Sequence, residues 1–333
     1  MNSFGRIFRI TIFGESHGTY TGVTIDGVPA GMSFGAEDMM EDIQRRQGGK
    51  AGTTPRKEPD EPLIVSGVFQ GYTTGAPVTI LFANKNIRSK DYSFVKSIPR
   101  PGHADFTAAK KYGGFQDYRG GGHFSGRLTL PLVAAGVLAK KIIAPAVVEA
   151  NIVSIGGKVR YETVLKEAMQ RGDSLGGIVS CTVQGLPAGL GEPFFDSVES
   201  VISHLVFSIP AVKGIEFGLG FESANRFGSE VNDVITDEKG TTATNNSGGI
   251  NGGITNGNDL YFKIAVKPAS SIAASQETYN FDKRAMDILS VKGRHDVCIA
   301  LRVPPVLEAV TAIALADLLM VNRGISHAKK SGI

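Results

Sequence analysis

Alternation of apolar and polar positions near the start of the chain predicts β-strands. Phe8–Phe13 and Val23–Val28 alternate threonine with apolar residues, a period of two that suits a strand with one buried face. We expect these two segments to pair with each other. Leu63–Val68 and Ala76–Phe82 have the same character and are predicted as further strands.

Three segments have the character of helices. Ala36–Arg46 is acidic at its start and basic at its end, which suits the helix dipole. Thr129–Ala150 and Pro304–Asn322 are long and apolar, as expected of helices in a layer that is covered on both faces. Because the first of these runs contains two lysines and Pro145, we expect a buried helix that breaks near the proline, and no membrane span.

Three other segments predict loops. Gln47–Arg56 is rich in glycine, and Arg88–Asp117 is mostly polar and irregular. Such a long loop in a compact domain is usually functional. Asn245–Asn258 looks low in complexity, but the strand-like segment Leu260–Val266 follows at once, so we expect an ordered binding loop.

The two halves of the chain share a sequence pattern. Val23–Met32 and Cys181–Leu190 each read as a strand followed by G-x-P-A-G, and an acidic amphipathic segment comes next in both halves. Two unrelated strand–turn–helix units would give the same pattern. We favour a pseudo-duplicated architecture in which each half contributes a sheet and helices pack between them. Since no linker separates the halves, residues 1–333 are expected to form one domain.

Composition narrows the class of protein. The chain is 42% hydrophobic, enough for a large core, and its 42 glycines lack the period of collagen. A net charge of +3 is too weak to indicate nucleic-acid binding. Cys181 and Cys298 lie in apolar runs, and the first residues lack the apolar core of a signal peptide. We therefore expect a reduced, cytoplasmic protein.

Common catalytic motifs are missing. The sequence has no G-x-G-x-x-G after a strand and no phosphate-binding G-x-x-x-x-G-K-[ST]. It also lacks H-E-x-x-H. These absences disfavour the common nucleotide-binding folds and the H-E-x-x-H zinc hydrolases.

Histidines instead gather in glycine-rich polar stretches. Four of the six histidines lie in the segments Gly14–Gly18, Arg100–Asp105, Gly120–Arg127 and Gly293–Asp296. A single histidine is usually structural, but glycine lets the backbone approach a ligand, and histidine titrates near neutral pH. Metal ligands would need shorter spacing. The pattern therefore favours acid–base chemistry.

Arginines in or beside these stretches indicate an anionic substrate. Arg45, Arg46, Arg119, Arg127 and Arg294 could be solvated surface residues, but their placement beside glycine and histidine favours a site. The planar guanidinium group suits carboxylate and phosphate. A set of converging arginines would bind a small polyanion. The turn at 267–271 could bind phosphate through its lysine and hydroxyls, or be a plain strand end.

Taken in order, the motifs GESHG, RRQGG, RPGHAD, RGGG with SGR, NGGI, KPASS and GRHD resemble those of the chorismate synthases. The resemblance extends from Gly14 to the helix after Pro304. It implies a trans-1,4-elimination that converts 5-enolpyruvylshikimate 3-phosphate to chorismate and phosphate, the last step of the shikimate pathway. It also implies an α+β fold, a β–α–β sandwich of two antiparallel sheets around a central helical layer, and a homotetramer.

The resemblance assigns catalytic and substrate-binding roles motif by motif. His17 resembles the acid that protonates the departing phosphate, and His103 the residue beside the reduced flavin near N1. Asp296, in relay with Ser16, resembles the partner of flavin N5. The residues expected to bind substrate are Arg46, Ser125, Gly126, Arg127 and Arg294.

The implied cofactor is reduced FMN, although the reaction has no net redox change. The residues expected to bind it are His123, Phe124, Ser125, Ala211, Gly252, Lys267, Pro268, Ala269, Ser270, Ser271 and Arg294. Two sources of reducing equivalents stay open: NADPH acting on this chain, or a separate flavin reductase as partner. No dinucleotide-binding motif is present.

Three departures from the family pattern concern binding. His123 and Phe124 stand where many members have Arg and Ser, and Pro210 stands where many have Asn. Gly52 stands where many have an arginine, with Lys50 or Arg56 as candidate substitutes.

Two other functions would use parts of the same pattern. A phosphate lyase or phosphatase that acts on a small polyanion would use the same arginines and histidines without flavin. An RNA-binding module would need aromatic residues beside its arginines. Arg46, Arg100 and Arg294 have none, which argues against nucleic acid as a partner.

Overall fold

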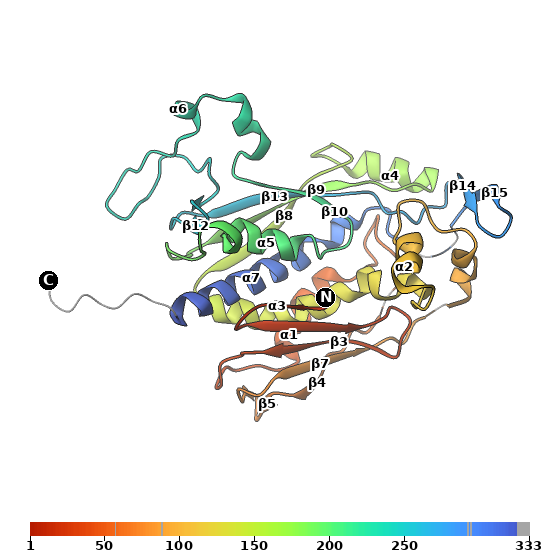
Figure 1. Cartoon of the computed structure of the whole chain (residues 1–333), viewed down its shortest axis with the longest axis horizontal. Helices are drawn as coiled ribbons and strands as arrows, with labels where there is room; N and C mark the ends of the chain where they lie inside the picture. Colours follow the sequence, from red (N-terminus) through yellow and green to blue (C-terminus); the bar gives the residue numbers. More distant parts are fainter. Residues whose placement is uncertain (57, 88, 292, 294, 325–333) are drawn as a thin grey trace.

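The computed structural model describes residues 1–56, 58–87, 89–291, 293 and 295–324. Within these residues, two antiparallel sheets form the frame of the molecule (Figure 1). The first sheet has the order β1 (Ser3–Phe4), β2 (Arg9–Gly14), β3 (Tyr20–Asp26), β7 (Val78–Ala83), β4 (Leu63–Ser66). The second has the order β10 (Val212–Phe217), β13 (Leu260–Val266), β9 (Gly177–Gln184), β8 (Val147–Ile155). The predicted α+β class with antiparallel sheets is therefore confirmed.

The predicted strands of the first half are present. β2 pairs with β3, as expected from their alternation, with Ile10 opposite Ile25. On β3, Val23 and Ile25 are fully buried. These side chains face the helices because a period of two puts them on one face of the sheet.

Long apolar helices lie between the two sheets (Figure 1). α3 (Thr129–Ile143) contacts β3 and β7, whereas α7 (Pro304–Gly324) contacts β8 and β9. The two helices also pack on each other so closely that a Cβ added to Gly136 would lie 2.4 Å from the Ala309 Cβ. α7 is long and apolar enough to cross a membrane, but most of it is buried inside the fold, as in a core helix. α1 (Glu37–Arg46) and α5 (Val198–Val206) pack beside this pair.

The predicted helix over Thr129–Ala150 is too long. α3 ends at Ile143, and strand β8 begins at Val147. Exposed and buried residues alternate from Val147 to Ala150, which is the period of a strand. The break at Pro145 is thus a change of element rather than a kink, and it was hidden because the whole run is apolar.

The expectation that Arg88–Asp117 is mostly irregular is also wrong. The segment contains the 3₁₀ helix η1 (Ser89–Lys96) and the α-helix α2 (Asp105–Tyr112). α2 begins with an acidic residue, has two lysines in its last turn, and is followed by Gly113 in the left-handed conformation.

Two threonines make the same contacts in the two halves. Thr73 donates its hydroxyl to the Pro29 carbonyl at 2.6 Å and accepts the Met32 N–H at 2.9 Å. Thr255 does the same with Pro187 at 2.8 Å and Leu190 at 2.9 Å. Each threonine ends a short hairpin; the two hairpins are β5–β6 (Val68–Phe69, Tyr72–Thr73) and β11–β12 (Ile250–Asn251, Ile254–Thr255). The segment 245–258 is accordingly ordered, as predicted.

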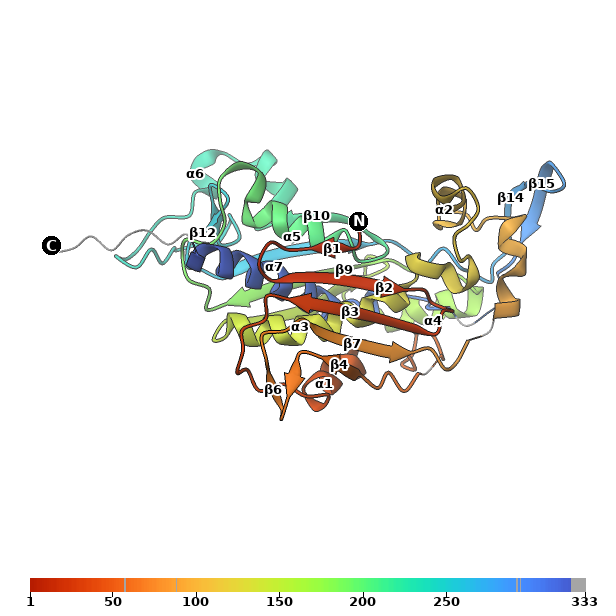
Figure 2. The same ribbon diagram turned by 60° about the horizontal axis from the view of Figure 1, so that its bottom comes forward.

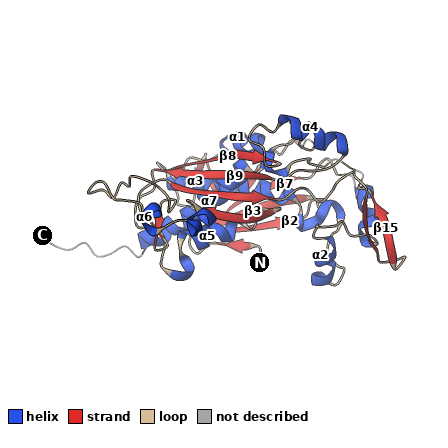
Figure 3. Ribbon diagram, turned by 90° about the horizontal axis from the view of Figure 1, so that it is seen from above, coloured by secondary structure: helices blue, strands red, loops and turns tan. Residues whose placement is uncertain are grey.

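The remaining elements lie at the two ends of the molecule. A segment with η5 (Gly220–Asn225) and α6 (Gly228–Val231) projects near the far end of α7 (Figure 2). At the opposite end, α2 lies beside the β14–β15 hairpin (Gln276–Asn280, Ala285–Leu289), as Figure 3 shows from above. α4 (Glu162–Arg171) lies beyond the β8 edge of the second sheet, as Figure 3 shows. The shorter 3₁₀ helices are η2 (Arg119–Phe124), η3 (Gly126–Leu128), η4 (Phe194–Asp196) and η6 (Ile299–Arg302).

Candidate active site

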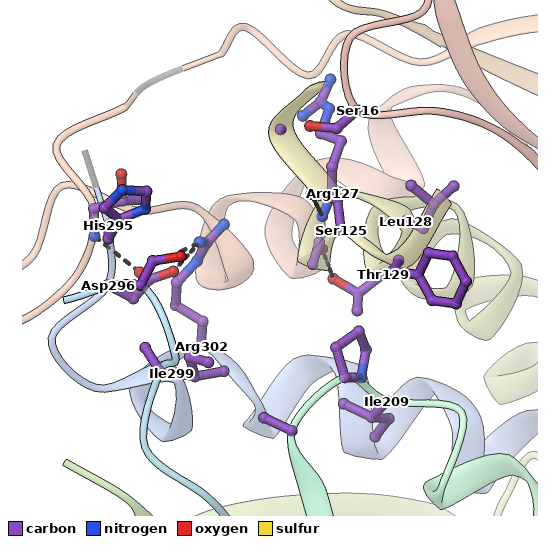
Figure 4. A pocket seen from close by; sticks show the side chains of 18 of the residues that line it. Ser16, Ser125, Arg127, Leu128, Thr129, Ile209, His295, Asp296, Ile299 and Arg302 are labelled. Atoms are coloured by element: carbon purple, nitrogen blue, oxygen red, sulfur yellow. Dashed lines mark hydrogen bonds and ion pairs between the residues drawn. The ribbon is translucent and has the colours of Figure 1, made fainter. Parts of the chain in front are cut away.

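A cavity of about 610 Å³ gathers most of the predicted site residues. It is lined by Ser16, by residues at and after the end of α1, and by the segments 100–104, 120–129, 208–211, 267–271 and 295–306. Figure 4 shows Asp296 and Arg302 on one side of this cavity, and Ser16, Ser125 and Arg127 across from them.

Three consecutive glycines form a turn beside the cavity, and the first of them, Gly120, lines it. Gly120, Gly121 and Gly122 all have positive φ, at 59°, 82° and 53°. A Cβ on Gly122 would lie 1.9 Å from the Asp117 carbonyl oxygen, which leaves room for glycine only. The Gly122 carbonyl accepts the N–H of Ser16 at 3.0 Å, so this turn fixes the loop that carries Ser16.

His17 lies directly behind this turn. Its side chain is 5% exposed and is not among the groups that line the cavity. A Cβ on Gly120 would come within 2.6 Å of His17 Nε2, and the ring meets Tyr92 edge-on at 5.3 Å. Gly120 and Tyr92 both line the cavity, so His17 is one residue removed from its interior.

Arg46 and Arg127 are buried around one carboxylate, Asp60. Arg127 forms an ion pair with Asp60 Oδ1 and donates its Nε to Asn84 Oδ1 at 2.9 Å. An Arg46 nitrogen lies 3.8 Å from Asp60 Oδ2. Arg46 also donates to Thr129 Oγ1 at 2.8 Å, so both guanidinium groups are held from several sides.

Burial makes the Arg46 guanidinium easier to deprotonate than that of an exposed arginine. Its side chain is almost fully enclosed, and this desolvation lowers the pKa of the Arg46 guanidinium to about 9. The nearby positive charges of Arg302 and Arg127 act in the same direction, and the Asp60 carboxylate opposes them. An anion placed beside Arg46 would raise this pKa again, because it stabilises the cationic form.

His103 is the centre of a second buried network. Its Nδ1 lies 2.7 Å from Asp105 Oδ1. Asp105 also accepts from Nε of Arg100 at 2.7 Å and from Nη2 at 2.8 Å. Burial disfavours the charge of Asp105, but the donors on Arg100 and His103 outweigh it and hold the pKa of this carboxyl well below its usual range.

Asp296 is anchored by a nearby residue, Arg302, and by Thr54 in the distant glycine-rich loop. Arg302 Nη1 lies 3.0 Å from Asp296 Oδ2, and the Thr54 N–H donates to Oδ1 at 2.8 Å. The Nε of the same Arg302 donates to the Arg46 carbonyl at 2.9 Å. The end of α1, the glycine-rich loop and Asp296 therefore form one connected unit.

The turn at Lys267–Ser271 lies against the loop of the second network. Lys267 Nζ donates to the Gly102 carbonyl at 2.5 Å and lies 3.4 Å from Ser270 Oγ. Arg100 donates to Ser271 Oγ at 2.9 Å. The Lys267 N–H donates to the carbonyl of Ala211, which has a positive φ of 76°. Pro268 and Ala269 complete this side of the lining.

The segment after the three glycines lies at the rim. His123 Nδ1 is 2.7 Å from the Gly14 carbonyl, and Phe124 is 38% exposed with its ring 6.3 Å from that of Tyr112. The Ser125 hydroxyl caps η3 by accepting the Arg127 N–H at 3.3 Å.

Besides His17, one described residue of the prediction is not part of the lining. Gly252 lies in the turn between β11 and β12, outside the lining. Arg294 falls outside the described residues.

Of the departures from the family pattern, Pro210 lines the cavity, and Gly52 has a positive φ of 77° with leucine side chains packed against it. Arg56 lines the cavity and pairs with Glu58 at 2.6 Å, whereas Lys50 is exposed and is not part of the lining. Arg56 is therefore the better placed of the two candidate substitutes.

Several site residues were not predicted from the sequence. These are Asp60, Tyr92, Arg100, Asp105 and Arg302. Arg100 and Asp105 stand inside the RPGHAD motif and could have been found there. Arg302 and Asp60 had no local pattern to mark them. In the part of the chain that the structure describes, no group of three or more His, Cys, Asp or Glu residues could hold a metal ion.

Comparison with known proteins gives a consistent result. A family model described as chorismate synthase matches residues 8–320. A chorismate synthase of Chitinophaga pinensis is 61% identical over 97% of this chain and 98% of that protein. One from Pyrococcus abyssi is 44% identical over 96% of this chain and 98% of its own. A crystal structure of chorismate synthase superposes with a TM-score of 0.75 at 28% identity, covering 96% of this chain and 94% of that one.

Proposed function

The chain belongs to the chorismate synthase family, and from this premise we propose how its cavity serves the reaction. The enzyme is a lyase of aromatic amino acid biosynthesis. It eliminates phosphate from 5-enolpyruvylshikimate 3-phosphate to give chorismate. The cavity must therefore bind a small polyanion, protonate its departing phosphate and accept a proton from carbon.

The charge of the cavity is the observation that carries the proposal. Among the described residues of its lining, the cationic side chains are Arg46, Arg56, Arg100, Arg127, Lys267 and Arg302. The carboxylates of the same lining are Glu58, Asp60 and Asp296. The substrate carries a phosphate and two carboxylates, so it matches a pocket in which positive charge exceeds negative charge.

We propose that Arg46 and Arg127 hold the anionic groups of the substrate, with Ser125 and Gly126 beside them. Their guanidinium groups are already oriented by Asp60 and Thr129, so binding would order few side chains. Arg294 is proposed for the same role on the resemblance of its motif.

Two proton transfers are assigned to different residues: protonation of the leaving phosphate to His17, and uptake of the proton lost from carbon to Asp296 with Ser16. His17 is proposed to protonate the departing phosphate, since phosphate leaves more readily once it is protonated. A shift of the glycine turn, or a proton relay across it, must connect His17 to the cavity, because Gly120 stands between them. Asp296 and Ser16 line the cavity on opposite sides and are proposed to take up and relay the proton lost from carbon.

The lining also fits the phosphate and the ring system of FMN. The Lys267 ammonium and the Ser270 hydroxyl lie close together beside Gly102. A Cβ added to Gly102 would stand 3.4 Å from this hydroxyl and 3.5 Å from Lys267 Nζ, in ordinary contact with both groups. Such donors suit a phosphate group, whereas Ile12 and Ile209 offer apolar walls for a flat ring. When bound, reduced FMN would donate electron density to the substrate and recover it, which requires no net oxidation.

The residues proposed to hold the cofactor are those of the family pattern: His123, Phe124, Ser125, Ala211, Lys267–Ser271, and Gly252 and Arg294 from outside the described lining. His103 is proposed to lie against the reduced ring. NADPH acting on this chain and a separate flavin reductase remain alternative sources of electrons, and a cytoplasmic location suits both.

We further propose that the chain is one pseudo-duplicated domain over residues 1–333, built as a β–α–β sandwich. The matching contacts of Thr73 and Thr255, each with a G-x-P-A-G turn, support the duplication. The placement of α3 and α7 between the sheets supports the sandwich. The homotetramer is proposed on family resemblance alone.

Phosphate release in the absence of flavin separates this proposal from a flavin-independent phosphatase or lyase. The enzyme is mixed anaerobically with the enolpyruvyl substrate and no flavin, and inorganic phosphate is measured. We expect no release above the buffer control. Release at catalytic rates would favour the flavin-independent function instead.

A further inference from the structure

We infer that Asp105 is a positioning residue that fixes the tautomer of His103, so that Nδ1 carries the proton and Nε2 is the nitrogen presented to bound molecules. The inference deepens the proposed function, on which the role of His103 rests. Neither Asp105 nor its partner Arg100 belongs to the residues that the family pattern led us to expect.

Asp105 is held in place by donors other than the histidine. Asp105 is 8% exposed, and its carboxylate accepts the Arg100 backbone N–H at 3.0 Å in addition to the Nε and Nη2 groups of the same arginine. Arg100 is itself buried and donates a further bond to Ser271 at 2.9 Å. Because several donors fix the carboxylate, its Oδ1 offers His103 an acceptor at a defined place.

Two neighbours of Nδ1 compete to set the tautomer. The Asp105 Oδ1 lies 2.7 Å from Nδ1 and, as a carboxylate oxygen, favours a proton on that nitrogen. The Arg100 Nη2, at 3.1 Å, is a donor and would favour a bare Nδ1 that accepts. The shorter contact to a charged acceptor wins, since an unprotonated Nδ1 would face a carboxylate oxygen with no hydrogen between them.

This arrangement leaves Nε2 available to act toward the cavity. His103 lines the cavity, and its Nε2 and Cε1 atoms each lie 3.5 Å from the place where a Cβ on Gly121 would stand. If this Nε2 is unprotonated, it can accept a proton or a hydrogen bond from a molecule bound in the cavity. Without Asp105, the Arg100 donor would capture Nδ1, and the proton would move to Nε2.

The tautomer can be measured directly on the intact enzyme. Protein labelled with ¹⁵N-histidine is titrated with pH, and the His103 signals are identified by their loss in His103→Gln. For the neutral ring we expect a protonated Nδ1 in the wild type and a protonated Nε2 in Asp105→Asn. A protonated Nε2 in the wild type, or the same tautomer in both proteins, would overturn the inference.

A matched control removes another buried carboxylate. Asp42 pairs with Arg45 at 2.8 Å and with Lys140 at 2.7 Å, and it does not line the cavity. We expect Asp42→Asn to leave the His103 tautomer unchanged. A tautomer switch in both variants would indicate a general structural effect and would count against Asp105.

Kinetics test whether the tautomer matters. Asp105→Asn is expected to lower kcat roughly 10²-fold, near the lower end of general acid–base contributions, with a small change in KM. Combined with His103→Gln, it should cause little further loss, because both changes remove one function. Additive losses would contradict a role through His103. If the wild type showed no chorismate formation at all, the proposed function would fail, but the tautomer measurement would stand on its own.

Discussion

The Arg302 guanidinium lies 3.0 Å from the Asp296 carboxylate and joins it to the end of α1 through the Arg46 carbonyl. This pair keeps the carboxylate turned to the cavity while its other oxygen is held by the Thr54 N–H. The carboxylate that we propose takes up a proton is thereby prevented from rotating away.

Replacing Arg302 should therefore affect catalysis more than binding. In Arg302→Gln we expect kcat to fall about 10–100-fold, because Asp296 loses its charged partner. Arg302→Lys should recover part of the rate, since it restores the charge without the planar geometry. Steady-state kinetics under anaerobic conditions provide the measurement. Equal kcat in all three proteins would show that Arg302 does not position Asp296 for catalysis.

His17→Gln tests the acid that serves the leaving phosphate. Turnover should fall by about 10²–10⁴-fold, the usual contribution of a general acid, while FMN binding measured by flavin absorbance stays close to wild type. His204→Gln is the control. His204 belongs to α5, packs against Phe4 and does not line the cavity. Wild-type turnover in His17→Gln would exclude His17 as the acid.

Gly120→Ala should disturb His17 without removing it. The new Cβ would lie 2.6 Å from the imidazole in a backbone with a positive φ of 59°. Gly31→Ala separates the two effects, because Gly31 has a φ of 85° and open space within 4 Å. Both should lose about 1–3 kcal/mol of unfolding free energy in urea, but only Gly120→Ala should also lose most of its turnover. Equal turnover in the two variants would show that the contact is unimportant.

Substrate affinity should weaken as the pH rises past about 9. Burial lowers the pKa of Arg46 to about 9, so its cationic form predominates below that pH and is lost above it. Calorimetric titration of the enolpyruvyl substrate across this range measures the effect. In Arg46→Gln the affinity should be weaker below about pH 9, where the wild-type residue is charged, and this pH dependence should disappear. The same dependence in wild type and Arg46→Gln would assign it to another group.

The parts of the fold that could be predicted from the sequence are those with a clear period. β2 and β3 follow from alternating residues, and α1 follows from its charge pattern and amphipathic face. The boundary near Pro145 was missed because a continuous apolar run does not reveal where the period changes from 3.6 to 2.

The site divides in the same way. Residues in glycine-flanked motifs were found, since the motif itself marks them. Asp60 and Arg302 were missed because their partners, Arg127 and Arg46, are distant in sequence, and only folding brings them together. The local part of a site can be predicted from one sequence, whereas the supporting contacts that come from distant parts of the chain cannot.

Chorismate formation from 5-enolpyruvylshikimate 3-phosphate, measured anaerobically with dithionite-reduced FMN, tests the central claim most directly. Chorismate absorbance and phosphate release are followed together, with oxidised FMN as the control. We predict both products in equal amounts, and only with reduced flavin. Folded protein that binds FMN but forms no chorismate, or that forms it equally well with oxidised FMN, would contradict the claim.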